Sequence, residues 1–159
     1  VVDGETAPTT VFAVDQTTGS VIASREIPDV GLSQVGIALH PTRGTLFLLG
    51  SNDEINEVNP ETGFIVNSFD VRDPSTPFFS VGTVGGIDVA PDGTLVVTGS
   101  SQSVRLISPL GDYVDDIDLR HILLEQRLSD ISIDDTTGEV WLTSDTGFIF
   151  RLSPIDFGI

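Results

Sequence analysis

The stretch VGIALHPTRGTLFLLGS (residues 35–51) returns as VGGIDVAPDGTLVVTGS (residues 84–100) and, more loosely, as LSDISIDDTTGEVWLTS (residues 128–144). Equivalent glycines in successive copies lie 50 residues apart (Gly36 and Gly86) or 45 residues apart (Gly93 and Gly138). A repeat of this length indicates one supersecondary unit that is stacked several times, because a single unit cannot bury its hydrophobic face alone. The repeat therefore predicts the architecture before any single element is assigned.

Each repeat contains four short apolar runs separated by turn-forming residues, the pattern typical of an all-β protein. The turns HPTRG, APDG and DDTTG join the first run to the second, and their Gly, Asp and Thr residues suit tight hairpins. The first runs are residues 36–39, 87–90 and 131–133, and the second are TLFLL, TLVVT and EVWLT. The third runs are residues 55–58, 104–107 and 148–152, and the fourth are residues 65–71 and 113–119.

The beginning of the chain fits the second half of the same unit, because VFAVDQTTGSVIASREIP aligns with INEVNPETGFIVNSFDV. We therefore expect one domain over residues 1–159 with thirteen strands. A helix of one or two turns is expected within LRHILLEQR, in the connection before the last repeat. The predicted units are a half blade (10–30), two complete blades (34–72 and 83–120) and an incomplete blade (127–154).

Four antiparallel strands per 45-residue unit predict the blades of a β-propeller. A β-sandwich or a β-solenoid is the alternative, and a sandwich would not require the same turn chemistry in every unit. Within each blade we expect the innermost strand to be covered on both faces by neighbouring blades. The chain supplies about three and a quarter blades, whereas propellers typically have about four to eight. Because open strand edges promote aggregation, we expect a protein partner, a second copy or further chain to complete the ring.

The charge balance narrows the range of partners. Seven arginines and no lysine stand against 24 acidic residues, so the formal net charge is −17. Nucleic-acid phosphates and anionic membrane surfaces would be repelled, and no apolar run approaches the length of a membrane helix. The absence of cysteine excludes disulfides and thiolate metal sites. This composition favours an extracellular or cell-surface prokaryotic protein or a halophile, and the lack of an initial methionine suggests processing or a longer polypeptide.

Several known propeller families resemble these units. The repeats are similar to those of NHL-type and YncE-like propellers, and GIALHPTRGTLFLLGSNDEINEVNPETG resembles repeats of the DUF4394 family of bacterial secreted domains. LSDISIDDTTGEVWLTSD resembles a blade of the SdiA-regulated and esterase-like phytase propellers. These resemblances imply a propeller fold and an extracellular location. The phytase-like resemblance also implies calcium held by acidic clusters.

Ligands of propellers usually bind at the connections between blades and at the turns between second and third strands. Phe78 and Phe79 follow two prolines in the longest connection, where they form a partner surface or else close the core. Arg120, His121 and Arg127 form a basic spot that either binds an anion or pairs with neighbouring acids. The predicted ligand or partner residues are Asn52, Asp53, Asp73, Phe78, Phe79, Arg120, His121, Arg127 and Asp145.

Calcium is the metal that the acidic clusters would suit, with Asp53, Glu54, Asp134 and Asp135 as candidate ligands. Their spacing matches neither an EF-hand nor a calcium-binding nonapeptide repeat. His40 occupies a turn and is interpreted as a structural residue.

The sequence contains no nucleophile elbow, zinc-protease motif or phosphate loop. The leading hypothesis is therefore a noncatalytic extracellular propeller module for protein or ligand binding and assembly. A metal-dependent hydrolase of the phytase or lactonase type is one alternative, and a filament subunit is another.

Overall fold

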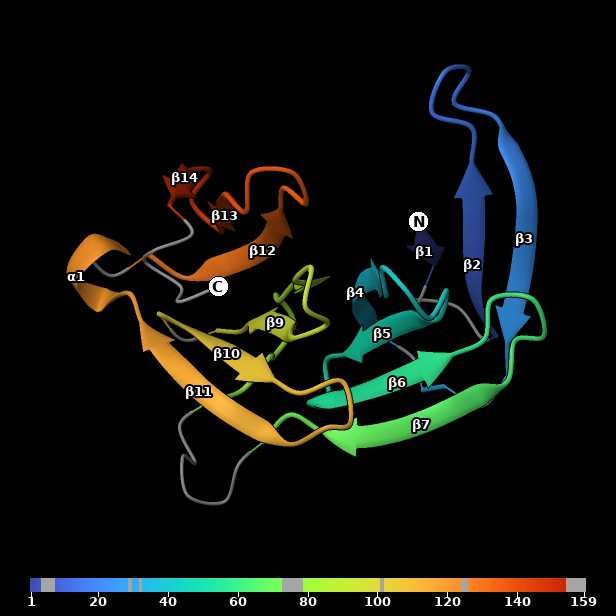
Figure 1. Ribbon diagram of the computed structural model, residues 1–159, viewed down its shortest axis with the longest axis horizontal. Helices are drawn as coiled ribbons and strands as arrows, with labels where there is room; N and C mark the ends of the chain where they lie inside the picture. Colours follow the sequence, from blue (N-terminus) through green and yellow to red (C-terminus); the bar gives the residue numbers. More distant parts are fainter. Residues whose placement is uncertain are drawn as a thin grey trace.

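Four antiparallel sheets follow one another along an open arc (Figure 1). The computed structural model describes residues 1–3, 8–28, 30–31, 33–72, 79–100, 102–123 and 126–153. We call the sheets blades 1 to 4 in chain order. Blade 1 and blade 4 lie at the two ends of the arc, on either side of its opening (Figure 1).

The strands of every blade lie in chain order within their sheet. Blade 1 contains β1 (Val2–Asp3), β2 (Thr9–Val14) and β3 (Val21–Ile27). Blade 2 contains β4 (Gln34–Leu39), β5 (Leu46–Gly50), β6 (Glu54–Val58) and β7 (Ile65–Asp70). Blade 3 contains β8 (Ile87–Val89), β9 (Leu95–Thr98), β10 (Ser103–Ile107) and β11 (Tyr113–Asp118). The one-turn helix α1 (Arg120–Leu123) precedes blade 4, which contains β12 (Leu128–Ile133), β13 (Val140–Ser144) and β14 (Ile149–Leu152).

Every strand predicted from the repeats is present within a few residues, and the helical turn before the last repeat is confirmed. The count of thirteen strands was wrong, because β1 adds a fourteenth among the described residues. β1 pairs with β2 through Val2 and Asp3, so the first sheet has three strands instead of two. A two-residue strand is too short to show the alternation by which strands are recognised in a sequence.

One turn design recurs four times, in two of the three copies of the sequence repeat and in the hairpins β2–β3 and β6–β7. In three copies the side-chain oxygen of Asp15, Asn59 or Asp134 accepts hydrogen bonds from the backbone N–H groups two and three residues ahead. Each turn ends on a glycine with φ between 68° and 77°, a conformation that other residues rarely adopt. The fourth copy uses the Nδ1 atom of His40, which accepts from the N–H groups of Thr42 and Arg43. His40 is thus a structural turn residue.

The hydrophobic core consists of three clusters, each between two consecutive blades. In blades 2 and 3 the second and third strands of the sheet are the most deeply buried: all of β9, and every residue of β5, β6 and β10 except the first. The expectation that innermost strands are covered on both faces is wrong for β4, where only Ala38 is buried. The middle strands are packed between neighbouring sheets, whereas β4 borders the inside of the arc (Figure 1).

Glycines allow the inner strands of consecutive blades to approach one another closely. A Cβ atom on Gly36 would lie 3.0 Å from Ile87 Cγ2. A Cβ atom on Gly86 would lie 2.7 Å from the Cα atom of Asp130 and 2.8 Å from the backbone nitrogen of Ile131. Beside this contact, the Ile133 N–H donates to the Asp88 carboxylate at 2.7 Å, which links β12 to β8. The repeated glycine is therefore a packing requirement of the blade junction.

The stability of the chain is expected to fall as the pH drops below about 6.5, the ordinary pKa of histidine. Burial, reinforced by the charge of Arg43, lowers the pKa of His40. Below about pH 6.5 this imidazole binds a proton more readily in the unfolded chain than in the folded one, so the free energy of unfolding falls as the pH falls. Protonation also removes the lone pair with which Nδ1 accepts the turn hydrogen bonds.

The substitution His40→Asn tests this effect, because Asn59 already forms the same turn without a titrating group. Urea unfolding at about pH 7.5 and about pH 5.5 should show a larger loss of stability for the wild type than for the variant. Burial raises the pKa of Asp88 and of Asp130, so these two carboxyl groups make the free energy of unfolding rise as the pH falls. Both proteins contain them, so they do not affect the comparison. Equal losses in the two proteins would contradict the role of His40.

Candidate binding surfaces

Asp53 joins blade 2 to the segment that leads into blade 3. It lies in the turn between β5 and β6 with a φ of 68°, and its side chain is largely buried. Its carboxylate accepts hydrogen bonds from the Val81 N–H at 2.6 Å and the Ser80 hydroxyl at 3.2 Å, and Arg72 Nε lies 3.8 Å away. The carboxylate predicted to bind a ligand or metal therefore has partners within the fold.

The neighbouring candidates form a small polar network. Asn52 Nδ2 donates to the Glu54 carboxylate at 3.0 Å, and the Ser68 hydroxyl donates to the same group at 2.6 Å.

The other two metal candidates lie in the turn between β12 and β13. The Asp134 carboxylate accepts the hydrogen bonds of the recurring turn, and the N–H groups of Thr136 and Thr137 lower its pKa. The predicted metal ligand Asp135 is exposed in the same turn. Among the described residues, no three His, Asp or Glu side chains are grouped so that they could hold a metal ion.

Phe79 is buried in the core between blades 2 and 3, so it closes the core instead of presenting a surface. Its ring lies 4.3 Å from the guanidinium carbon of Arg105, a side chain with no exposed surface. The two other predicted residues of this connection, Asp73 and Phe78, lie outside the described residues.

Arg105 is the most deeply buried charge among the described residues, and the sequence analysis did not identify it. From β10 it donates two hydrogen bonds to Asp116 on β11, at 2.8 and 2.7 Å, and one to the Val71 carbonyl of blade 2 at 2.8 Å. Its guanidinium carbon also lies 5.2 Å from the centre of the Tyr113 ring. Side chains alternate along a strand, so Arg105 points to the side of β10 opposite Val104 and Leu106. The arginine within the apolar run SVRLI was the sequence signal by which it could have been identified.

The predicted basic spot is divided into separate local contacts. Exposed Arg120 pairs with Asp118, with Nη2 2.5 Å from the carboxylate, and lowers the pKa of Asp118 to about 2. His121 is exposed on the same helical turn. The Arg127 carbonyl accepts the Asp145 N–H at 3.1 Å, so these two residues are adjacent through their backbones. Of the two alternatives, anion binding and pairing with a neighbouring acid, the structure therefore shows the second for Arg120.

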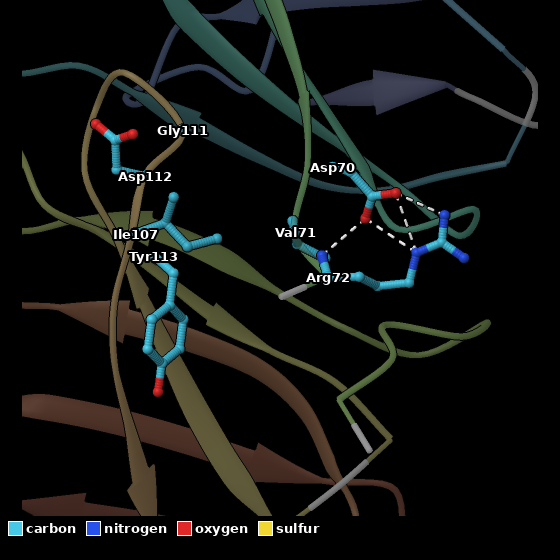
Figure 2. A pocket seen from close by; sticks show the side chains of 7 residues that line it. All are labelled: Asp70, Val71, Arg72, Ile107, Gly111, Asp112 and Tyr113. Atoms are coloured by element: carbon cyan, nitrogen blue, oxygen red, sulfur yellow. Dashed lines mark hydrogen bonds and ion pairs between the residues drawn. The ribbon is translucent and has the colours of Figure 1, made fainter. Parts of the chain in front are cut away.

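Two shallow hollows share the ion pair between Asp70 and Arg72 at the outer edge of blades 2 and 3. Figure 2 shows the first, of about 280 Å³, with the ion pair on one side and Ile107, Asp112 and Tyr113 on the other. The second lies beside the Asn52 and Glu54 network. Arg72 lowers the pKa of Asp70 by donating hydrogen bonds to its carboxylate. Arg72 and Asp70 therefore compensate each other's charge, while Asp112 lines the first hollow and Glu54 the second.

A third hollow, of about 300 Å³, is mainly apolar and lies between blades 1 and 2. Its walls include Val11, Ala13, Ile37 and Leu46, and Arg25 is the only charged residue that lines it. It opens next to the blade 1 to blade 2 cluster and contains no carboxylate or histidine. This composition suits apolar contact and offers no group for acid–base or nucleophilic chemistry.

The face of blade 4 that points away from blade 3, which we call the blade 4 end face, differs in exposure from its counterparts. Residues at the same register positions are Phe47, Leu49 and Ile55 in blade 2, Val96, Thr98 and Val104 in blade 3, and Trp141, Thr143 and Ile149 in blade 4. The six residues of blades 2 and 3 are 0 % exposed, whereas Trp141 is 41 % and Ile149 is 69 % exposed. Arg151 on the same face lies 5.7 Å from the Trp141 ring and pairs with Glu139.

Sequence reasoning missed the blade 4 end face, because its residue types do not set it apart. Trp141 and Arg151 stand where the covered blade 2 has Phe47 and the buried Glu57, again an aromatic residue and a charge. The feature that distinguishes this face is the exposure of Trp141 and Ile149.

Four antiparallel sheets that pack face to face along an arc, each with its strands in chain order, place the chain in the β-propeller class. Among solved structures, the WD40 β-propeller domain of Doa1 is similar to this chain, with a TM-score of 0.50 and 15 % sequence identity. The match covers 85 % of this chain and 41 % of that chain, so this chain spans less than half of its length.

The sequence comparisons identify no family: no protein-family model and no curated protein matches the chain. Within the part of the chain that the structure describes, no helix is long and apolar enough to cross a membrane. The comparison with a known structure therefore confirms the predicted fold class, at the level of the propeller and not of a particular family.

Proposed function

We propose that this chain is a noncatalytic β-propeller module that binds a protein partner through the blade 4 end face, outside the cell or on the surface of a prokaryote. The observation that carries the proposal is the exposure of Trp141 and Ile149 at positions whose counterparts in blades 2 and 3 are completely buried. A family relationship to NHL-type, YncE-like or DUF4394 propellers is part of this proposal, on the strength of the shared blade pattern.

The chemistry of the face supports protein binding. Tryptophan and arginine are the residue types that contribute most to binding energy at protein interfaces, and here Arg151 lies over the Trp141 ring. Among the described strands, β14 pairs only with β13, so its other edge offers backbone N–H and C=O groups to a partner.

Capture by the immobilised chain tests this function. Wild type, Trp141→Glu and a control variant, Phe64→Glu, would be exposed to the extracellular protein fraction of the source cells. Phe64 is 67 % exposed in the turn after β6, so the control introduces the same charge on another surface. Wild type and control should retain the same protein, and Trp141→Glu should lose it. Equal capture by all three would overturn the proposed function.

A further inference from the structure

We propose that the hollow between blades 1 and 2 binds a small carboxylic acid with an apolar chain. The carboxylate would pair with Arg25, and the chain would lie against Val11, Ile37 and Leu46. The hollow shares no residue with the blade 4 end face, so this inference does not depend on the proposed function. It is carried by a comparison of this junction with the two junctions that follow it, between blades 2 and 3 and between blades 3 and 4.

A small side chain opens the hollow on the blade 1 side. Ala13 stands two residues before the turn that joins the last two strands of blade 1, and at the same place blade 2 has Glu57 and blade 3 has Leu106. Both of these larger side chains are buried. Ala13 pairs across the sheet with Ala23, so two alanines lie side by side in the wall of the hollow. The space that a buried side chain fills at the later junctions is therefore open here.

Arg25 occupies a register position that is apolar in the next two blades. Blades 2 and 3 have Phe69 and Ile117 there, and both pack against the apolar cluster of their junction. The stem of Arg25 lies against Gly63, since a Cβ atom on that glycine would be 3.3 Å from Arg25 Cδ. Phe69 lies against Gly111 in the equivalent way. The contact that positions an aromatic ring at one junction thus positions a cation beside the hollow at another.

The charge of Arg25 is not compensated within the described part of the chain. No carboxylate among the described residues forms an ion pair with Arg25, whereas five other arginines each have such a partner. At the next junction, the Glu57 carboxylate accepts hydrogen bonds from the Thr45 hydroxyl at 2.6 Å and from Arg43 Nη1 at 3.4 Å. With Ala13 in place of that glutamate, the first junction has an arginine and an open space but no carboxylate. A ligand that carries a carboxylate would complete it.

The other walls of the hollow suit an apolar chain. Val11, Ile37 and Leu46 surround the first apolar cluster but are only partly buried, and Leu39 is 59 % exposed. The volume of about 300 Å³ lies at the lower end of the range for small-molecule sites, which favours a short chain over a long lipid. The net charge of the protein repels anions, but at about 0.15 M salt, charges more than about 8 Å away are largely screened.

Isothermal titration calorimetry with hexanoate, octanoate and decanoate tests the site. The affinity should increase about four-fold with each CH₂ group that the hollow buries, until it is filled. Octanol has the apolar chain of octanoate without its charge. It should bind several-fold more weakly, because it cannot form a charge-assisted pair with Arg25.

Two variants separate the contribution of the space from that of the charge. Ala13→Leu introduces the residue that blade 3 has at this position, so the protein should remain folded and lose octanoate binding. Arg25→Gln should bind octanoate no more tightly than octanol. The matched control Arg127→Gln removes an arginine next to blade 4 and should bind octanoate as the wild type does. Circular dichroism checks that each variant is folded.

The inference is overturned if the wild type binds none of the three acids. It is also overturned if Ala13→Leu and Arg25→Gln bind octanoate as the wild type does, because the acid then binds elsewhere on the apolar surface. Equal affinity of the wild type for octanol and octanoate would remove the role assigned to Arg25. Trp141→Glu should bind octanoate normally, so a failure of the proposed function and a failure of this inference can be told apart.

Discussion

Replacing Arg105 with leucine is expected to lower the free energy of unfolding by about 3–5 kcal/mol, the cost of breaking a buried ion pair from one side. The substitution leaves the Asp116 carboxylate without its two guanidinium hydrogen bonds and the Val71 carbonyl without its donor. It also removes the cation from the Phe79 ring. Since Arg105 joins blade 3 to the end of blade 2, the loss should weaken the junction as well as the sheet.

A second arginine provides a matched control. Arg120 makes the same two-pronged contact with Asp118, but its side chain is 74 % exposed. Exposed ion pairs contribute little to stability, so Arg120→Leu should leave the urea midpoint close to that of the wild type. Urea unfolding of both variants measures the difference. A similar small effect for Arg105→Leu would show that the buried pair does not hold the junction together.

Gly86→Ala is expected to cost about 1–3 kcal/mol, the usual range for an overpacked core. The added Cβ would lie 2.7 Å from the Cα atom of Asp130 and 2.8 Å from the Ile131 nitrogen, and backbone atoms cannot rotate away as a side-chain end could. Blades 3 and 4 must therefore separate. Amide hydrogen exchange should increase at β8 and β12, where the hydrogen bond from Ile133 to Asp88 crosses the junction.

Gly31→Ala is the control for this second prediction. No atom lies within 4 Å of the position that its Cβ would occupy, and its φ is outside the left-handed region. Alanine there should leave stability unchanged or raise it by about 0.4–1 kcal/mol, because it restricts the unfolded chain. If both alanine variants had the stability of the wild type, the close approach of β8 and β12 would not be a requirement of the fold.

The elements that were predictable from the sequence are those whose causes are local. Each strand is bounded by a turn whose chemistry lies within five residues, as in DQTTG, NPETG and DDTTG, and each turn ends on a glycine in the left-handed region. A turn with a left-handed glycine recurs at the hairpins of every blade, and similar hairpins stack on one another. The fold class follows from that regularity, without knowledge of any tertiary contact.

The features that sequence reasoning missed depend on how two blades lie against each other. Asp53 seemed available to a ligand, but its partners Ser80 and Val81 lie beyond a long connection. Arg105 reaches Val71 in the preceding blade, 34 residues away along the chain. No short sequence motif links residues that lie this far apart along the chain. The candidate site was therefore predictable only where a residue pairs with a near neighbour, as Arg120 does with Asp118.

The three apolar clusters make the molecule behave as a chain of coupled units. Each cluster joins only adjacent blades, so the stability of a blade depends on its own hydrogen bonds and on one or two interfaces. Blades 2 and 3 have two interfaces each, whereas within this chain blades 1 and 4 have one each. Under mechanical load applied at the termini, rupture should begin at the outer sheets and proceed inward in discrete steps. Closing the arc would remove these weak ends and turn a stepwise rupture into a single cooperative one.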